Sequence, residues 1–173
     1  MYTHRDCMNP DQQKACDALS YIIPILEDLN LRWCITGGFA CYVYGVPRNI
    51  TDIDIDIEVS KDDPSFKKFL ELVKPHITSP LEHFVDQNYD NYNVEVMEIL
   101  DICPMAEMDI FIKEKGEYEN FYKDGFPDIE IAEFQGFKLP LLSKALIIKN
   151  KEMLVWQRES DFEDIEGLRA LMD

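Results

Sequence analysis

A run of acidic residues that alternates with apolar ones, from Thr51 to Val59, is the pattern in this chain that could support chemistry. Successive side chains of a β-strand point to opposite faces, so the run places its acids together on one face. These acids are Asp52, Asp54, Asp56 and Glu58. Neighbouring carboxylates on that face lie roughly 6.6 Å apart, at about 3.3 Å per residue. Asp52 and Asp54 could therefore bind one or two cations together, and Mg²⁺ prefers such oxygen ligands.

The acidic run needs an explanation because aspartate has a low strand propensity. A solvent-exposed edge strand is the alternative to a metal site, since edge strands carry charge to resist pairing with other chains. Asp56 shares a face with Asp54, but no ligand role is assigned to it. The residues that precede the strand favour the metal site.

A glycine pair, Gly37-Gly38, comes shortly before this strand, with Gly38 preceding Thr51 by 13 residues. The short β-prone segment 32–36 leads into the pair, and 39–44 can form a helix directly after it. Glycines let the backbone approach phosphate oxygens closely, and the N-terminus of the following helix presents free N–H groups to them. Thr36 could add a hydroxyl group to such a site. The alternative is that the glycines only form a tight turn.

Three short segments carry a resemblance to a known family: Thr36-Gly37-Gly38-Phe39-Ala40, Tyr44-Gly45-Val46-Pro47-Arg48 and Thr51-Asp52-Ile53-Asp54-Ile55. Together they resemble the signature of the nucleotidyltransferase superfamily that includes DNA polymerase β. In that signature a Gly-Gly or Gly-Ser turn opens a helix, and an Asp-x-Asp strand follows at a similar spacing. The resemblance extends over Trp33–Val59, about a sixth of the chain.

The resemblance implies an enzyme that transfers a nucleoside monophosphate from a nucleoside triphosphate, ATP among the candidates, to a hydroxyl acceptor with release of pyrophosphate. Asp52 and Asp54 would bind one or two Mg²⁺ ions beside the triphosphate. Superfamily members carry a third carboxylate on a neighbouring strand, and Asp109 is the counterpart here, with Glu95 and Glu107 as competitors. Asp109 would be a metal ligand or the general base in an in-line phosphoryl transfer.

Basic residues that could contact the nucleotide lie on both sides of the acidic strand. Lys149 and Arg158, with Asp161 and Asp164, resemble the closing helices of small bacterial superfamily members, including toxins of abortive-infection toxin–antitoxin pairs. The resemblance implies that such a lysine and arginine reach the phosphates and offset charge on the leaving pyrophosphate. The alternative for these residues is an exposed helix with ordinary charge pairs. Arg48 is open to two interpretations, a nucleotide contact or a salt bridge to an acidic neighbour.

The charge of the chain bears on the acceptor. Lys and Arg number 17 and Asp and Glu number 34, which gives a net charge of −17. This charge opposes the phosphate attraction on which most nucleic-acid binders rely, so it favours a small cationic acceptor over a nucleic acid. The resemblance offers aminoglycoside and lincosamide nucleotidyltransferases as examples. A toxin-type enzyme acting on tRNA or protein, and a non-catalytic member acting as a binding partner, are the alternatives.

The elements that must position these residues indicate an α+β fold, in which a mixed, mostly antiparallel sheet is flanked by helices. Apolar residues at i, i+3 and i+4 spacing predict helices at Asp11–Leu29, Asp63–Val73, Pro140–Lys151 and Asp161–Met172. Strands are expected at Arg32–Thr36, Thr51–Val59, Asn93–Leu100, Ala106–Ile112 and Asp128–Phe134. The resemblance implies that this is the nucleotidyltransferase fold.

Length and composition predict one domain over residues 1–173, with a helical C-terminal part at 140–173. The five cysteines are odd in number and form no Cys-x-x-Cys pair, so neither a disulfide framework nor a zinc cluster is expected. No apolar stretch has the length of a membrane span or of a secretory signal core, so a soluble, cytoplasmic protein is expected. Oligomeric state and base preference leave no trace in the sequence.

Overall fold

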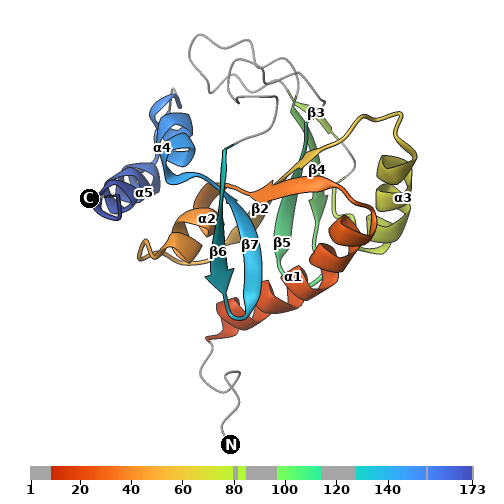
Figure 1. The fold of residues 1–173 in the computed structure, drawn as a ribbon, viewed down its shortest axis with the longest axis horizontal. Coiled ribbons are helices and arrows are strands. Elements are labelled where there is room, and N and C mark those ends of the chain that lie inside the picture. Colours follow the sequence, from red (N-terminus) through yellow and green to blue (C-terminus); the bar gives the residue numbers. More distant parts are fainter. Residues whose placement is uncertain (1–8, 80–81, 85–96, 114–127, 155, 173) are drawn as a thin grey trace, which may run out of the picture.

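The computed structural model describes residues 9–79, 82–84, 97–113, 128–154 and 156–172. Within these residues, seven strands form one sheet in the order β3-β4-β5-β2-β1-β7-β6 (Figure 1). The strands are β1 Arg32–Ile35, β2 Asp52–Glu58, β3 Glu82–Phe84, β4 Met97–Ile102, β5 Glu107–Lys113, β6 Ile129–Phe134 and β7 Phe137–Leu142. Among the described strand pairs, β2–β5 and β1–β7 are parallel and the other four are antiparallel. The expected mixed, mostly antiparallel sheet is confirmed.

In the described part of the chain, five α-helices flank the sheet: α1 Pro10–Asp28, α2 Gly37–Tyr44, α3 Pro64–Val73, α4 Lys144–Glu152 and α5 Glu159–Ala170. A 3₁₀ turn, Lys74–His76, follows α3. At the starts of α1, α3 and α4, side chains accept hydrogen bonds from free backbone N–H groups. Asn9 and Gln12 form a capping box at α1, Asp63 caps α3 and Ser143 caps α4.

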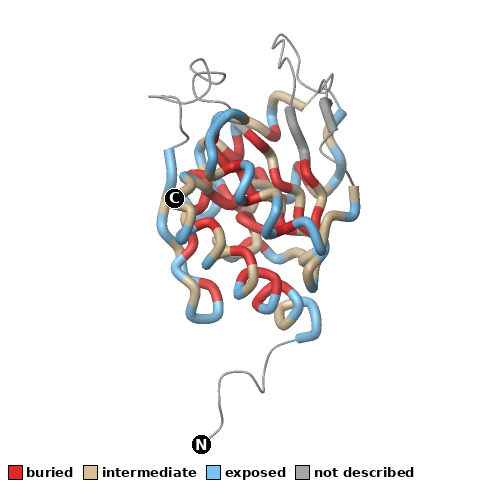
Figure 2. Tube along the Cα trace, turned by 90° about the vertical axis from the view of Figure 1, so that its right-hand side faces the viewer, coloured by how far each residue is buried: buried red, intermediate tan, exposed pale blue. Residues whose placement is uncertain are grey.

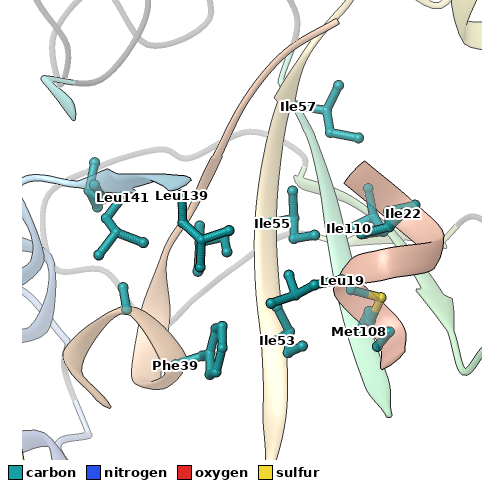
Figure 3. Packing of buried hydrophobic residues seen from close by; sticks show 14 of the residues in the cluster. Leu19, Ile22, Phe39, Ile53, Ile55, Ile57, Met108, Ile110, Leu139 and Leu141 are labelled. Carbon is teal, nitrogen blue, oxygen red and sulfur yellow. The ribbon is translucent and has the colours of Figure 1, made fainter. Parts of the chain in front are cut away.

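The helices lie in two groups around the sheet, with α2, α4 and α5 at the left of Figure 1 and α1 and α3 along its bottom and right. The alternating isoleucines of β2 lie with Met108 and Ile110 of β5 beside Leu19 and Ile22 of α1 (Figure 3). All these side chains are buried, and buried residues run through the centre of the chain trace, with exposed ones outside (Figure 2). One face of β2 therefore forms the hydrophobic core, and alternation turns its acids to the other face.

The position of β2 excludes the edge-strand interpretation of its acids. β2 lies between β1 and β5 in the middle of the sheet, so both of its edges are hydrogen-bonded. Central strands have no need of charge to prevent pairing with other chains. The acids of β2 therefore require another explanation.

The predicted helix at Pro140–Lys151 is wrong in its first turn. Pro140 to Leu142 belong to strand β7, and the helix begins only at Lys144, after the cap at Ser143. A short apolar run is compatible with a strand or with a buried helix, so periodicity could not distinguish the two. The helical C-terminal part of the chain thus begins at Lys144. None of the helices in the described part of the chain has the length and apolar character of a membrane span.

Candidate metal centre

Three aspartates on two neighbouring strands converge at one end of the sheet. Asp54 of β2 and Asp109 of β5 are register partners in the parallel pair, and Asp52 lies two residues before Asp54 on the same face. Each of the three offers a carboxylate oxygen, and these oxygens lie within 4.8 Å of one another. The structure thus brings together the three aspartates that the sequence singled out. Carboxylate oxygens at this separation fit a hard divalent cation such as Mg²⁺.

Burial and repulsion by neighbouring carboxylates raise the pKa values of Asp54 and Asp109, two members of the cluster. Burial, followed by the charges of Asp52, Asp109 and Asp56, raises the pKa of Asp54 to about 7. Burial, followed by the charge of Asp101 and then of Asp52 and Glu107, raises the pKa of Asp109 to about 6. A divalent cation would relieve this repulsion, which is a second reason why the donor set fits a metal.

The glycine turn packs directly against the cluster. Gly37, the first residue of α2, has a φ of +60°, in the left-handed region that favours glycine. A Cβ atom at Gly37 would overlap the Asp54 carboxylate, so only glycine fits this approach. The Gly38 N–H donates a hydrogen bond to the Asp54 carboxylate, which opposes the rise in the Asp54 pKa. The free N–H at the start of α2 thus serves Asp54 in this structure.

Thr36 and Thr51 lie beside the aspartates. Thr36 is the N-cap residue of α2, and its N–H donates to the Asp54 backbone carbonyl at 2.9 Å. The Thr36 hydroxyl makes no capping bond to the helix. The Thr51 hydroxyl donates to Asp52 Oδ1 at 2.6 Å, which helps to orient that carboxylate.

Of the two interpretations of Arg48, a nucleotide contact or a salt bridge, the structure shows the salt bridge. Its guanidinium pairs with the Asp164 carboxylate of α5, and only 19% of the Arg48 side chain is exposed. The guanidinium also covers Gly38 so closely that a Cβ there would overlap it. Arg48 therefore links the start of α2 to α5.

The lysine that the structure buries is Lys151, two residues beyond the predicted Lys149. Lys149 is exposed on α4, whereas Lys151 Nζ lies 2.6 Å from Asp161 Oδ1 and 2.9 Å from Asp164 Oδ2. The alternative of an exposed helix with ordinary charge pairs is wrong for Asp161 and Asp164, since both are buried.

Arg158, the N-cap residue of α5, is close enough to the cluster for the charges of Asp52 and Asp54 to act on it. Its pKa is raised first by hydrogen bonding to Asp161 and further by the charges of Asp161, Asp52 and Asp54. Its Nε donates to Asp161 Oδ2 at 3.1 Å, while 77% of its side chain is exposed. The Arg158 guanidinium is thus hydrogen-bonded to Asp161, while most of the side chain is open to solvent.

Sequence reasoning missed two features of the site. Phe162 and Leu171, two large apolar residues near the ends of α5, are exposed. The buried face consists of Asp161, Asp164, Ile165 and Leu168. These residues follow the i, i+3, i+4, i+7 spacing, so the same periodicity could have placed the two aspartates inside the protein.

The second missed residue is Asp101 of β4, the register partner of Asp109. It extends the row of carboxylates to a third strand. Of the two competitors for the Asp109 position, Glu107 pairs in register with Asp52 and is exposed, whereas Glu95 lies outside the described residues. The other acids of β2 are buried, and Glu58 forms an ion pair with Arg32 at 2.6 Å.

Comparison with known proteins bears on the fold of the chain. No protein-family model and no curated protein sequence matches the chain. Several solved structures are similar in fold, and three of them serve as examples. A Thermotoga maritima protein described as a nucleotidyltransferase has a TM-score of 0.60 and 16% identity, with 98% of each chain covered. The lincosamide antibiotic adenylyltransferase LnuA, with lincomycin bound, has a TM-score of 0.58 and 17% identity, covering 88% of this chain and 95% of LnuA.

The third is ANT(2")-Ia in complex with adenylyl-2"-tobramycin, which has a TM-score of 0.57 and 13% identity. The match covers 93% of this chain and 90% of that one. These likenesses extend over nearly the whole chain, far beyond the sixth that carries the sequence signature. The chain has the nucleotidyltransferase fold, as the resemblance implied.

Proposed function

We propose that this protein is a divalent-metal-dependent nucleotidyltransferase that transfers a nucleoside monophosphate from a nucleoside triphosphate to a hydroxyl group, with release of pyrophosphate. The observation that carries the proposal is the convergence of Asp52, Asp54 and Asp109 within 4.8 Å, beside the glycine turn that opens α2. In this reaction the acceptor oxygen forms a bond to the α-phosphorus as the bond to the pyrophosphate oxygen breaks.

The three aspartates would hold the metal, either as one Mg²⁺ or as two. Bound Mg²⁺ would neutralise the triphosphate and lower the pKa of the attacking hydroxyl. Asp109 can also accept the hydroxyl proton, because a carboxyl group with a pKa of about 6 is ionised at neutral pH. Thr36 and the glycine turn lie against Asp54 and would face the phosphates held there.

Arg158 is the residue that we assign to the leaving pyrophosphate. Its guanidinium is exposed and close enough to Asp52 and Asp54 for their charges to raise its pKa. An arginine can bind phosphate oxygens through two parallel hydrogen bonds and so offset the charge that develops on them. Lys149, exposed on the adjacent helix α4, remains a second proposed phosphate contact.

For the acceptor we propose a small cationic molecule. Asp101 and Glu107 continue the row of carboxylates past the cluster, and the chain carries a net charge of −17. This field attracts cations and repels polyanions, which speaks against tRNA. The structures of LnuA and ANT(2")-Ia contain small antibiotics or their adenylylated product, which supports an acceptor of similar size.

The test is incubation of the protein with Mg²⁺, each labelled nucleoside triphosphate and a panel of aminoglycosides, lincosamides and tRNA. Mass spectrometry then measures the mass added to each acceptor. We expect a nucleoside monophosphate on a cationic small molecule and an equal amount of pyrophosphate. Asp52→Asn and Asp54→Asn should each remove the product, because either variant disrupts the metal ligands.

Glu133→Gln is the matched control, since it neutralises an exposed carboxylate of β6 away from the cluster. It should leave the transfer rate unchanged. Equal product from wild type and Asp54→Asn would contradict the metal site. Calorimetry that finds no Mg²⁺-dependent binding of any triphosphate to the wild type would remove the enzyme proposal altogether.

A further inference from the structure

A group of buried charges lies behind the glycine turn, where three segments of the chain meet. Asp161 and Asp164 of α5 are 0% and 1% exposed, and Lys151 of α4 is 7% exposed. Lys151 contacts both carboxylates, and Arg48, from the loop after α2, pairs with Asp164. Burying charged groups costs several kcal/mol per ion, and apolar residues often stabilise a fold as well. Stability alone is therefore a weak explanation for this network.

The network touches the glycine turn at two points. The Arg48 guanidinium lies over Gly38, in the space that a Cβ would need. Cys41, one helical turn further along α2, donates from its Sγ to the Gly37 carbonyl at 3.3 Å. Burial, followed by the charge of Asp164, raises the pKa of the Cys41 thiol to about 12, so this thiol stays protonated and remains a donor. Asp164 thus reaches the turn through Arg48 and also neighbours Cys41.

The glycine turn also fixes the position of the Asp54 carboxylate. Gly38 donates its N–H to the Asp54 carboxylate, and Gly37 leaves no space between its Cα and that carboxylate. Any displacement of the start of α2 would therefore move the Asp54 oxygens or remove their hydrogen bond. A continuous set of contacts runs from Asp164 through Arg48 and the turn to Asp54.

We propose that Asp164 and Arg48 are positioning residues, through which helix α5 holds the glycine turn in the place that aims the Asp54 carboxylate at the metal. This inference rests on the proposed function. Neither residue touches the metal or the nucleotide in this role. Mutation of a group that orients a metal ligand, without binding the metal itself, typically lowers metal affinity or activity by roughly ten- to a hundredfold.

Contacts between α5 and the loop that carries Arg48 support this role. The α4–α5 pair follows the last strand, and its buried charges meet Arg48 rather than solvent. Gly167 of α5 packs so tightly on Val46 that a Cβ would lie 2.9 Å from Val46 Cγ1. The loop that carries Arg48 is thus held against α5 by shape as well as by charge. Such contacts limit the movement of the turn relative to the sheet.

The test is direct binding of Mn²⁺, a spectroscopic substitute for Mg²⁺, in the presence of a non-hydrolysable triphosphate. Electron paramagnetic resonance of free Mn²⁺ gives the affinity for wild type, Arg48→Met, Asp164→Asn and the double variant. We expect each single variant to bind Mn²⁺ roughly tenfold more weakly. The double variant should be no weaker than the weaker single one, because both changes break one line of contacts. Urea unfolding of the same samples measures stability separately.

Arg169→Met is the matched control. It removes the exposed Arg169–Glu152 pair, which also joins α4 to α5, without touching the turn. Its Mn²⁺ affinity should equal that of the wild type. Arg48→Met leaves Asp164 paired with Lys151, so it should still fold even if Asp164→Asn does not.

The outcomes separate the two proposals. A wild type that binds no Mn²⁺ with the triphosphate overturns the proposed function and this inference with it. A wild type that binds Mn²⁺, beside folded Arg48→Met with unchanged affinity, overturns the inference alone. A folded double variant whose losses add would show that Asp164 does not act through Arg48. Lower stability with unaltered Mn²⁺ affinity would assign the network to folding only.

Discussion

Gly37 and Gly45 allow the role of close approach to be measured apart from backbone strain. Both have positive φ, +60° and +108°, so alanine is strained at either position. A Cβ at Gly45 would meet nothing within 4 Å, whereas one at Gly37 would overlap the Asp54 carboxylate. We expect Gly45→Ala to lose about 1 kcal/mol of unfolding free energy and to keep its metal-dependent triphosphate binding. Gly37→Ala should lose more, and its affinity for Mg²⁺ with triphosphate should fall at least about tenfold.

Urea unfolding and calorimetric titration with Mg²⁺ and a triphosphate analogue check this pair. Equal affinities in Gly37→Ala and Gly45→Ala would mean that the contact with Asp54 does not matter for binding. Reduced affinity in both variants would point to the backbone of α2 as a whole instead of this one approach.

The sequence could identify those residues whose presence is unfavourable unless they serve a site. Asp52 and Asp54 stand out because acids alternate along a strand, and Gly37 because a glycine pair precedes them. The pairing of Asp164 with Arg48 carries no such local signal, since the two residues lie 116 apart in the chain. Asp101 is likewise recognised only through its pairing with Asp109 across two strands.

At the scale of elements, Gly167 and Val46 test how tightly α5 is docked. A Cβ at Gly167 would lie 2.9 and 3.0 Å from the two Val46 methyl groups. Alanine in place of glycine inside a helix normally stabilises it by about 1 kcal/mol. Val46 is 4% exposed and β-branched, so it has little freedom to move away, and overpacking costs typically about 1–3 kcal/mol. We therefore expect Gly167→Ala to lower the unfolding free energy by on the order of 1 kcal/mol.

In a Val46→Ala background, the effect of Gly167→Ala on the unfolding free energy should have the opposite sign. With the Val46 methyl groups removed, the helix gain remains and the collision is gone, so Gly167→Ala should raise the unfolding free energy. The four proteins form a double-mutant cycle in urea. Stabilisation by Gly167→Ala in both backgrounds would show that α5 is not tightly packed on this loop.

Elements with a strong local pattern were predicted well, and those defined by tertiary partners were not. β2 and α1 follow from alternation and from helical spacing, and the observed bounds, Asp52–Glu58 and Pro10–Asp28, lie close to the expected ones. β7 was missed because its apolar run fits either structure locally, and its pairing with β1 and β6 decides it. The buried face of α5 likewise depends on tertiary partners, because Lys151 and Arg48 compensate the charge of its aspartates inside the protein.

For the whole molecule, the cluster makes stability depend on pH and on metal in linked ways. In the metal-free protein the pKa values of Asp54 and Asp109 are about 7 and about 6, above the ordinary value of 3.8. Between about pH 4 and pH 7 the folded state therefore binds protons that the unfolded chain has released. Through these groups the unfolding free energy falls as pH rises across that interval. Asp161, with a lowered pKa, acts in the opposite sense and at lower pH.

Mg²⁺ should remove this loss, because it binds the ionised carboxylates and competes with protons. We expect the increase in Tm on adding Mg²⁺ to grow from about pH 5 to about pH 8, measured by differential scanning calorimetry. Asp54→Asn should raise the Tm of the metal-free protein at about pH 8, flatten the dependence on pH and abolish most of the Mg²⁺ effect. If neutralising Asp54 stabilises the protein but removes its function, the carboxylate is retained in order to bind a cation.

Sodium chloride separates this local effect from the general repulsion expected of a net charge of −17. At about 0.15 M, salt screens exposed charges beyond about 8 Å, so it should raise Tm by similar amounts in wild type and Asp54→Asn. Mg²⁺ at matched ionic strength should distinguish them, because only the wild type offers all three carboxylates. If Mg²⁺ and sodium chloride shift both proteins alike, divalent cations act on the surface as a whole and the cluster holds none of them.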